Sequence, residues 1–250
     1  MRNNHEHLLK NNAILGRLTG EDRATVLKDG QVTSFKLRQG VYDPDQRINE
    51  VYFPINSVLS VVTHMENGTV IEIGTIGREG MTGIPLLMGA DSTPNTSFCQ
   101  VDGECWEMSA STFRQLLEQS DTFRAFVNRY LQAYVNMLGQ FIGCNRLHSV
   151  YERAARWILM TQDRVDEDEF PLTHEFLATM LGSRRSGVTL AAAALQKAGF
   201  ISYHRGCITV LDRDALVGTA CECYGVTKRE FDAMLRPEAK IGNGKRREVA

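Results

Sequence analysis

The sequence predicts an α+β fold in three parts: a β-rich N-terminal half, one long helix, and a C-terminal winged helix-turn-helix. Three observations carry this prediction. Residues 32–108 contain short apolar runs with the period of strands, separated by recurring glycines. Residues 109–161 follow a helical pattern instead. Residues 173–201 contain two short helical patterns on either side of a glycine, and a β-hairpin pattern follows.

Bulk composition places the chain among ordinary globular proteins. It has 250 residues, a net charge of −2 and six cysteines without a disulfide-rich pattern, which suits a reducing cytoplasm. The sequence has no apolar run of about 18 residues or more, so we expect no membrane partner. The N-terminus also lacks an apolar signal segment. Because the overall charge is slightly negative, any nucleic-acid contact must come from a local patch.

The N-terminal part, residues 1–119, is predicted to begin with short helices over residues 7–30, with Thr19 and Asp22 at a helix start. The strands that follow are punctuated by two hairpin turn signals, Asn67-Gly68 and Asp102-Gly103. Many short strands with glycine turns predict a jelly-roll-like β-roll. Ser111 is the predicted cap of a short helix after the roll.

Residues 120–148 are predicted to form the long helix, beginning at Ser120 or Asp121. Its apolar stripe repeats at close to 3.5 residues, which is typical of a coiled-coil seam. The stripe could pack on the β-rich half, but its length and breadth favour pairing with a second copy of the chain. The predicted dimer contacts are Val127, Tyr130, Leu131, Tyr134, Leu138 and Phe141.

Residues 149–236 are predicted to form the winged helix-turn-helix, with an acidic loop at 165–169, a further helical segment at 214–234, and a disordered tail at 237–250. Thr173 caps the first helix of the motif, Gly182 ends it, and Ser183 caps the second. Residues 200–211 form the wing.

The charge pattern of this motif favours double-stranded DNA as the partner. No Asp or Glu occurs between Glu175 and Asp212, whereas four basic side chains do. The first turn of the second helix is the part that reaches base edges in the major groove. The predicted DNA contacts are Thr173, Ser183, Arg184, Arg185, Ser186, Thr189, His204 and Arg205.

The Ser183–Ser186 opening, and the run from Leu195 to Ile201 that leads into a hairpin, resemble the winged helix of the Crp/Fnr transcription regulators. The β-rich half resembles the sensor domain of that family in size, position and turn spacing. The resemblance implies a homodimer formed through the long helix, palindromic operators, and RNA polymerase as a partner. It places Arg185 at the family's first base-reading arginine, Ser186 at its glutamate, and the later reader near Thr189 or Leu190.

The sensor half departs from the cyclic-nucleotide-binding members of that family. They carry a Gly-Glu pair and then an Arg that holds the cyclic phosphate. Here the order is Glu79-Gly80, and no arginine occurs at 92–97. We therefore expect that cyclic AMP is not a ligand and that no cofactor is present. Gating by a cyclic nucleotide or another effector stays an alternative, with pocket candidates Arg78, Glu79, Gly80, Asn95 and Thr96.

Other chemistries find little support in the sequence. No cysteine precedes Cys99, which argues against the N-terminal iron–sulfur cluster of oxygen-sensing relatives. Cys221 and Cys223 form a C-x-C pair, which we interpret as small buried residues rather than metal ligands. His5 and His7 are interpreted as solvated. The sequence carries no G-x-S-x-G, H-E-x-x-H or P-loop motif, so we do not expect an enzyme.

Overall fold

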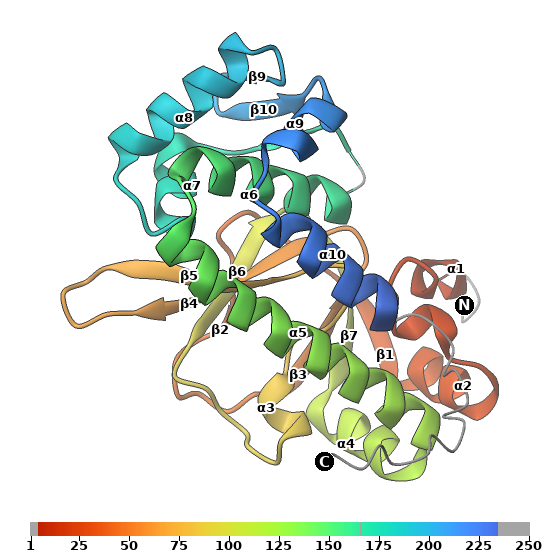
Figure 1. Ribbon diagram of the computed structural model, residues 1–250. Helices are drawn as coiled ribbons and strands as arrows, with labels where there is room; N and C mark the ends of the chain where they lie inside the picture. Colours follow the sequence, from red (N-terminus) through yellow and green to blue (C-terminus); the bar gives the residue numbers. More distant parts are fainter. Residues whose placement is uncertain (1–4, 166, 235–250) are drawn as a thin grey trace, which may run out of the picture.

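The computed structural model describes residues 5–165 and 167–234, and the tail predicted to be disordered lies outside them. The chain begins with three short helices on one edge of the β-roll: α1 (Glu6–Leu9), η1 (Leu15–Arg17) and α2 (Gly20–Asp29) (Figure 1). The start of α2 after Thr19 confirms the predicted helix start.

Two antiparallel sheets form the roll, as predicted. The first has the order β1-β7-β3 and the second the order β2-β6-β4-β5. Their bounds are β1 (Gly30–Phe35), β2 (Gly40–Tyr42), β3 (Glu50–Pro54), β4 (Val58–His64), β5 (Val70–Ile76), β6 (Thr96–Val101) and β7 (Gly103–Ser109). The inner faces of the sheets bury large apolar side chains such as Phe53, Leu59 and Trp106, which form the core between them.

One predicted hairpin is confirmed and the other is wrong. Gly68 has φ of 80° in the turn between β4 and β5, and Asn67 Oδ1 accepts a hydrogen bond from the amide of Thr69 at 3.0 Å. By contrast, Asp102-Gly103 joins β6 to β7, which lie in different sheets. A Cβ on Gly103 would lie 2.8 Å from Asn56 Oδ1, so the glycine allows the chain to cross between the sheets there.

Helices then cover the roll. After α3 (Ile84–Leu87), α4 (Ala110–Gln119) begins at Ser109, whose Oγ accepts from the amide of Thr112 at 3.1 Å. The predicted cap, Ser111, instead lies inside α4, because the backbone already turns into the helix at Ala110 and Ser109 is the extended residue before it. The long helix α5 (Asp121–Leu147) begins as predicted, with Ser120 Oγ accepting from the amide of Phe123 at 3.0 Å. No helix among the described residues is long and apolar enough to cross a membrane.

The apolar stripe of α5 packs mainly within the subunit. Val127, Tyr130, Tyr134 and Phe141, predicted as dimer contacts, are buried against the rest of the same chain. They are therefore not available to a partner subunit, and this part of the prediction is wrong. The stripe is broader than one coiled-coil seam because α5 packs on the roll with one side and on a second helix of its own chain with another.

The C-terminal domain contains α6 (Val150–Val165), α7 (His174–Met180), α8 (Arg185–Lys197) and α9 (Arg213–Thr219). Three strands complete it in the order β8-β10-β9, with bounds β8 (Glu169–Pro171), β9 (Ile201–His204) and β10 (Cys207–Val210). The predicted loop over 165–169 leads into β8, which begins at Glu169 and pairs with β10. The sequence did not predict this strand, because three residues are too few to show a strand period.

A final helix, α10 (Cys223–Met234), leaves this domain and runs back along α5 (Figure 1). The ring of Phe231 stacks on Tyr130 of α5 at 6.3 Å, and Asn136 donates to Glu230 at 2.5 Å. The predicted helical segment at 214–234 is thus two helices, which separate at Ala220 and pack on different parts of the molecule.

Candidate nucleic-acid interface

The helix-turn-helix is built from α7 and α8. Thr173 Oγ1 accepts from the amide of Phe176 at 3.1 Å, which confirms the predicted cap of α7. Gly182 has φ of 54° and turns the chain, as predicted. The residue that precedes α8 is Arg184, and its side chain makes no capping bond. Ser183 was the wrong cap because its amide still donates to Ala178 O at 2.9 Å, within the turn that closes α7.

One face of α8 is buried and the other is open. Val188, Ala191, Ala192 and Leu195 pack into the domain, as the apolar spacing predicted. The open face presents the five exposed side chains Arg184, Arg185, Ser186, Thr189 and Leu190. Guanidinium groups pair bidentately with guanine, and apolar side chains contact the thymine methyl group. Leu190, 73% exposed, offers such a contact on a helix with no acidic residue.

The wing projects beside this helix. β9 and β10 pair with His204 opposite Cys207, and Arg205 and Gly206 form the connection. Both residues have positive φ, 48° and 81°, as a tight two-residue hairpin turn requires. His204 and Arg205 are exposed at the tip. The structure therefore brings the predicted wing residues to a position from which a basic side chain can contact phosphate.

His174, in the first turn of α7, was missed by sequence reasoning. Its ring stacks on Tyr203 of the wing at 4.3 Å, and its Nδ1 lies 3.2 Å from Thr189 Oγ1. Burial, reinforced by the nearby charge of Arg185, lowers the pKa of His174 and favours the neutral imidazole. His174 thus joins α7, α8 and the wing. No sequence pattern reveals it, since the three contacts come from separate elements.

The core helix of the domain, α6, supports the turn. Arg153 donates to the carbonyl of Leu181, which is one of the last carbonyls of α7 and has no partner within that helix. The guanidinium of Arg156 lies 4.0 Å from the centre of the Phe141 ring on α5. Both arginines are buried, so Arg153 supports the turn, Arg156 joins α6 to α5, and neither is exposed on the surface.

The domain docks on the second sheet of the roll. Phe176 of α7 contacts the rings of Phe98 and Trp157, at 6.1 and 6.3 Å. Behind these rings, Trp157 Nε1 donates to Glu72 Oε1 at 3.0 Å. Glu72 Oε2 shares a hydrogen bond of 2.8 Å with Ser60. Burial raises the pKa of Glu72 to about 7. A buried polar network therefore lies between the two domains.

The predicted effector-pocket residues separate into two groups. Arg78, Glu79 and Gly80 follow the end of β5, whereas Asn95 and Thr96 lie at the start of β6. Thr96 is level with Glu72 in the sheet, since both pair with Val62. Arg78 and Glu79 line one cavity, whereas Thr96 lines another. The residues of the predicted pocket are therefore divided between two cavities.

Arg164 of α6 forms an ion pair with Glu79, the acidic residue of the predicted pocket. Its Nε and Nη2 donate to Glu79 Oε1 at 2.9 and 2.8 Å, and the two side chains are only 6% and 15% exposed. Gly80 packs against the ring of Tyr130, where any Cβ would overlap the ring. The Tyr130 hydroxyl donates to Met81 O at 3.1 Å. Side chains of the chain itself thus fill the space beneath α5.

A cavity of about 450 Å³ opens beside this ion pair, between the N-terminal helices, α6 and α10. Its lining is mixed in charge, with several basic side chains, three acids and two aromatic rings. The basic and aromatic side chains of the lining include Lys10, Arg17, Arg78, Lys228, Tyr224 and Phe231.

Comparisons with known proteins find matches over both halves of the chain. The model of the cyclic nucleotide-binding domain matches residues 23–120, and that of the Crp-like helix-turn-helix domain matches residues 152–218. A comparison with curated protein sequences finds no match.

Three solved structures show the same fold at low sequence identity. A Crp/Fnr family regulator from Eubacterium rectale has a TM-score of 0.64 at 17% identity, over 84% of this chain and 98% of that chain. A CRP family regulator from Thermus thermophilus has a TM-score of 0.64 at 18% identity, over 75% and 96%. The c-di-GMP responsive regulator CLP of Xanthomonas campestris has a TM-score of 0.60 at 15% identity, over 76% and 98%.

Proposed function

We propose, from the premise that this chain belongs to the Crp/Fnr family of transcription regulators, that it acts as a homodimer on palindromic operators. The observation that carries the proposal is the open face of α8, whose first turn exposes Arg184 and Arg185. In a helix-turn-helix this end of the second helix is the one that reaches base edges in the major groove. The proposed protein partner is RNA polymerase, which a DNA-bound regulator of this class contacts from its operator.

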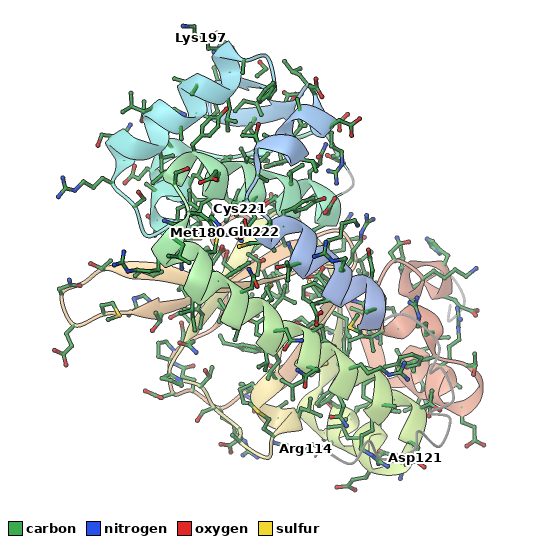
Figure 2. All side chains as sticks on the ribbon, viewed as in Figure 1. Arg114, Asp121, Met180, Lys197, Cys221 and Glu222 are labelled. Carbon is green, nitrogen blue, oxygen red and sulfur yellow. The ribbon has the colours of Figure 1, made fainter. Side chains whose placement is uncertain are left out.

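Arg185 is the proposed reader of guanine. Its replacement by alanine should cost about 1–3 kcal/mol at one base position and relax specificity there, as expected for a bidentate contact. Selection of bound sequences from a random duplex pool, with wild type and variant, measures this. Lys197→Ala is the matched control, because Lys197 lies at the far end of α8 (Figure 2). Its replacement should at most lower the affinity by the same factor for every DNA sequence. An even loss on all sequences for Arg185→Ala would leave only a phosphate contact.

The glutamate position of the family is Ser186 here, and a serine cannot replace a carboxylate that accepts from cytosine N4. We propose that the half-site differs from those of glutamate-bearing members. Leu190 is the proposed contact for a thymine methyl group. The enriched palindrome should have half-sites about one helical turn apart if two α8 helices read it.

The homodimer is proposed to form through an exposed seam on α5. Leu131, Val135, Leu138 and Ile142 follow one another at alternating steps of four and three residues, which is the a/d spacing of a coiled coil. Val135 is 51% exposed and Ile142 is 75% exposed, although both are aliphatic. Gly139 lies on the same side, and a Cβ there would meet nothing within 4 Å among the described residues. Two copies of α5 can therefore approach closely.

Ile142→Asp should convert the protein from dimer to monomer, because the seam would bury a carboxylate against its copy. Sedimentation velocity measures the change. Val217→Asp is the control, since Val217 is an exposed aliphatic residue of α9, away from the seam. A wild-type monomer, or an unchanged dimer in Ile142→Asp, would exclude this seam as the dimer contact.

We further propose that the sensor domain does not bind cyclic AMP tightly. Glu79 is engaged by Arg164, and residues 92–97 provide no arginine for the cyclic phosphate. Titration calorimetry with cyclic AMP should show no binding at micromolar concentration. Saturable binding with a stoichiometry of one per chain would contradict the proposal.

A second candidate is a regulator gated by another small effector, and the cavity beside Glu79 and Arg164 favours it. Basic side chains from three elements (Lys10, Arg17 and Lys228) and the aromatic residues Tyr224 and Phe231 suit an anionic ligand with an apolar or aromatic part. Thermal shift with a panel that includes c-di-GMP tests this. Enrichment of a palindrome without added ligand would show that DNA binding does not require an effector.

A further inference from the structure

Four potential metal ligands meet where the long helix ends and the last helix begins. Cys144 lies in the last turn of α5, and His148 is the residue that ends it. Cys221 and Cys223 lie at the start of α10, more than 70 residues later in the sequence. The three sulfurs and one imidazole nitrogen all lie within 4.8 Å of one another. Figure 2 shows Cys221 and Glu222 at the start of α10, beside α5.

The spacing of these atoms fits a single tetrahedral ion. A tetrahedron with metal–sulfur bonds of about 2.3 Å has its ligand atoms about 3.8 Å apart. The sulfurs of Cys144 and Cys221 are 3.5 Å apart, and Cys223 Sγ is 3.5 Å from His148 Nδ1. The other pairs lie within 4.8 Å, so shifts of up to about 1 Å would bring all four to bonding distance. Three cysteines and one histidine are one of the common ligand sets of structural zinc.

Neighbouring groups orient the ligands as they do around bound zinc. His148 presents Nδ1 to the cysteines, and its Nε2 lies 3.1 Å from the carboxylate of Glu222. A carboxylate on the outer nitrogen fixes the tautomer that leaves the inner nitrogen free to bind metal. Gln140 Nε2 donates to Cys223 Sγ at 3.1 Å, and such a bond also stabilises a thiolate.

Buried positive charge lies beside the cluster, because the guanidinium groups of Arg153 and Arg156 interact electrostatically with the sulfur of Cys144. Three thiolates and one divalent cation leave a net charge of −1, which the buried Arg156 and Arg153 offset. The three cysteines themselves are buried, so water does not compete for the sulfurs.

We propose that Cys144, His148, Cys221 and Cys223 bind one Zn²⁺ ion, which fastens α10 to the C-terminal end of α5. Binding releases the remaining thiol protons to solvent. The sequence interpretation of Cys221 and Cys223 as buried residues agrees with the structure, but their partners come from a distant segment that the C-x-C spacing does not reveal. This proposal does not depend on DNA binding.

A disulfide between Cys144 and Cys221 is the competing use of the cluster, because the two sulfurs are already adjacent. A disulfide would use only two of the three sulfurs, and it would not account for the arrangement of Cys223, His148 and the Glu222 carboxylate beside them. All five side chains have a place in a zinc site, and the metal is therefore the better explanation.

The test uses the full chain, purified with a reductant and without a chelator. Elemental analysis should give about one zinc per chain. Co²⁺ titrated into the chelator-stripped protein should produce thiolate-to-metal charge-transfer bands and the intense visible bands of tetrahedral cobalt. Cys144→Ser and Cys223→Ser should lose both signals, whereas Cys207→Ser should keep them, because Cys207 lies in the wing and outside the cluster.

Two further variants separate metal binding from folding. His148→Cys should retain zinc and change the cobalt spectrum toward that of four thiolates. Glu222→Gln should keep the site but lower zinc affinity about 10–100-fold, as expected for an outer-sphere partner. If a serine variant does not fold, the cobalt titration of the wild type decides alone.

The proposal is overturned if folded, fully reduced wild type gives no charge-transfer band with Co²⁺. It is also overturned if protein alkylated during lysis contains a Cys144–Cys221 disulfide and no metal. Retention of one zinc in both serine variants would place the metal elsewhere and would overturn it as well.

Discussion

Replacing Glu72 by glutamine should make the stability of this protein less dependent on pH, because the buried carboxyl must carry a proton. Ser60 has one hydroxyl proton but lies 2.8 Å from Glu72 Oε2 and 2.7 Å from Gln100 Oε1. The Gln100 amide is fixed by its donation to Thr161 Oγ1 at 3.1 Å. The one hydroxyl proton of Ser60 can be donated to only one of these oxygens at a time, and a protonated Glu72, which can itself donate to Ser60, removes the conflict.

The size of the effect follows from the pKa. Burial raises the pKa of Glu72 from 4.5 to about 7, while Arg156 and Arg164 lower it only in part. Since the folded pKa exceeds the unfolded one, the folded state binds the proton more tightly, and stability falls as pH rises from about 4.5 through 7. Each unit is worth about 1.4 kcal/mol, so the wild type should lose about 2–3 kcal/mol from this group between pH 5 and pH 8.

Glutamine keeps both bonds, because its amide NH₂ donates to Ser60 and its oxygen accepts from Trp157, without a group that ionises. Urea unfolding at several pH values, for wild type and Glu72→Gln, gives the difference directly. The two should agree near pH 5 and diverge by about 2–3 kcal/mol at pH 8, with the variant more stable. Glu66→Gln, on the exposed turn of the same hairpin, should follow the wild type. Parallel curves for Glu72→Gln would show that the carboxyl is ionised and that this account of the network is wrong.

Three other substitutions test separate parts of the structure. Glu79→Gln leaves the buried Arg164 without its counter-charge and should cost about 3–5 kcal/mol in urea unfolding, whereas the exposed Glu118→Gln should cost little. Gly80→Ala should lower the melting temperature, since its Cβ overlaps the Tyr130 ring, and Gly218→Ala should not, because a Cβ there meets nothing within 4 Å among the described residues. Leu190→Ala should leave stability unchanged but reduce the preference for thymine at one operator position by about 1 kcal/mol; an unaltered selected sequence would remove Leu190 from the readout.

The architecture was predictable because its signals are local. Asn67-Gly68, the Ser120 and Thr173 caps and the turn glycine Gly182 each act within four residues of the chain, and each is confirmed. The errors at Ser111 and Ser183 have different causes. Ser109 and Ser111 both stand near the start of α4 and only the backbone geometry selects Ser109, whereas Ser183 still belongs to the turn that closes α7 and α8 begins without a side-chain cap.

What the sequence could not supply are pairings between distant segments. The α5 stripe predicted a buried face, yet the partner of Tyr130 is Phe231, a hundred residues later, and not a second subunit. Asp102-Gly103 carries a hairpin signal, but the choice between pairing in one sheet and crossing to another depends on Asn56. Arg164 likewise looks like an ordinary helix residue until Glu79 is brought beside it.

The return of α10 to α5 changes how the C-terminal domain can move. The chain crosses the boundary between the two halves twice, and the crossings lie side by side, with His148 on one and Cys221 on the other. A domain joined by one chain segment can rotate in all three directions about the point of attachment. A domain joined by two adjacent segments bends about the axis through both attachment points and resists the other rotations. The bonds of Trp157 to Glu72 and of Arg164 to Glu79 also hold the C-terminal domain on the roll, so a reorientation of α8 requires them to open, and the two crossings then favour bending about the axis through both.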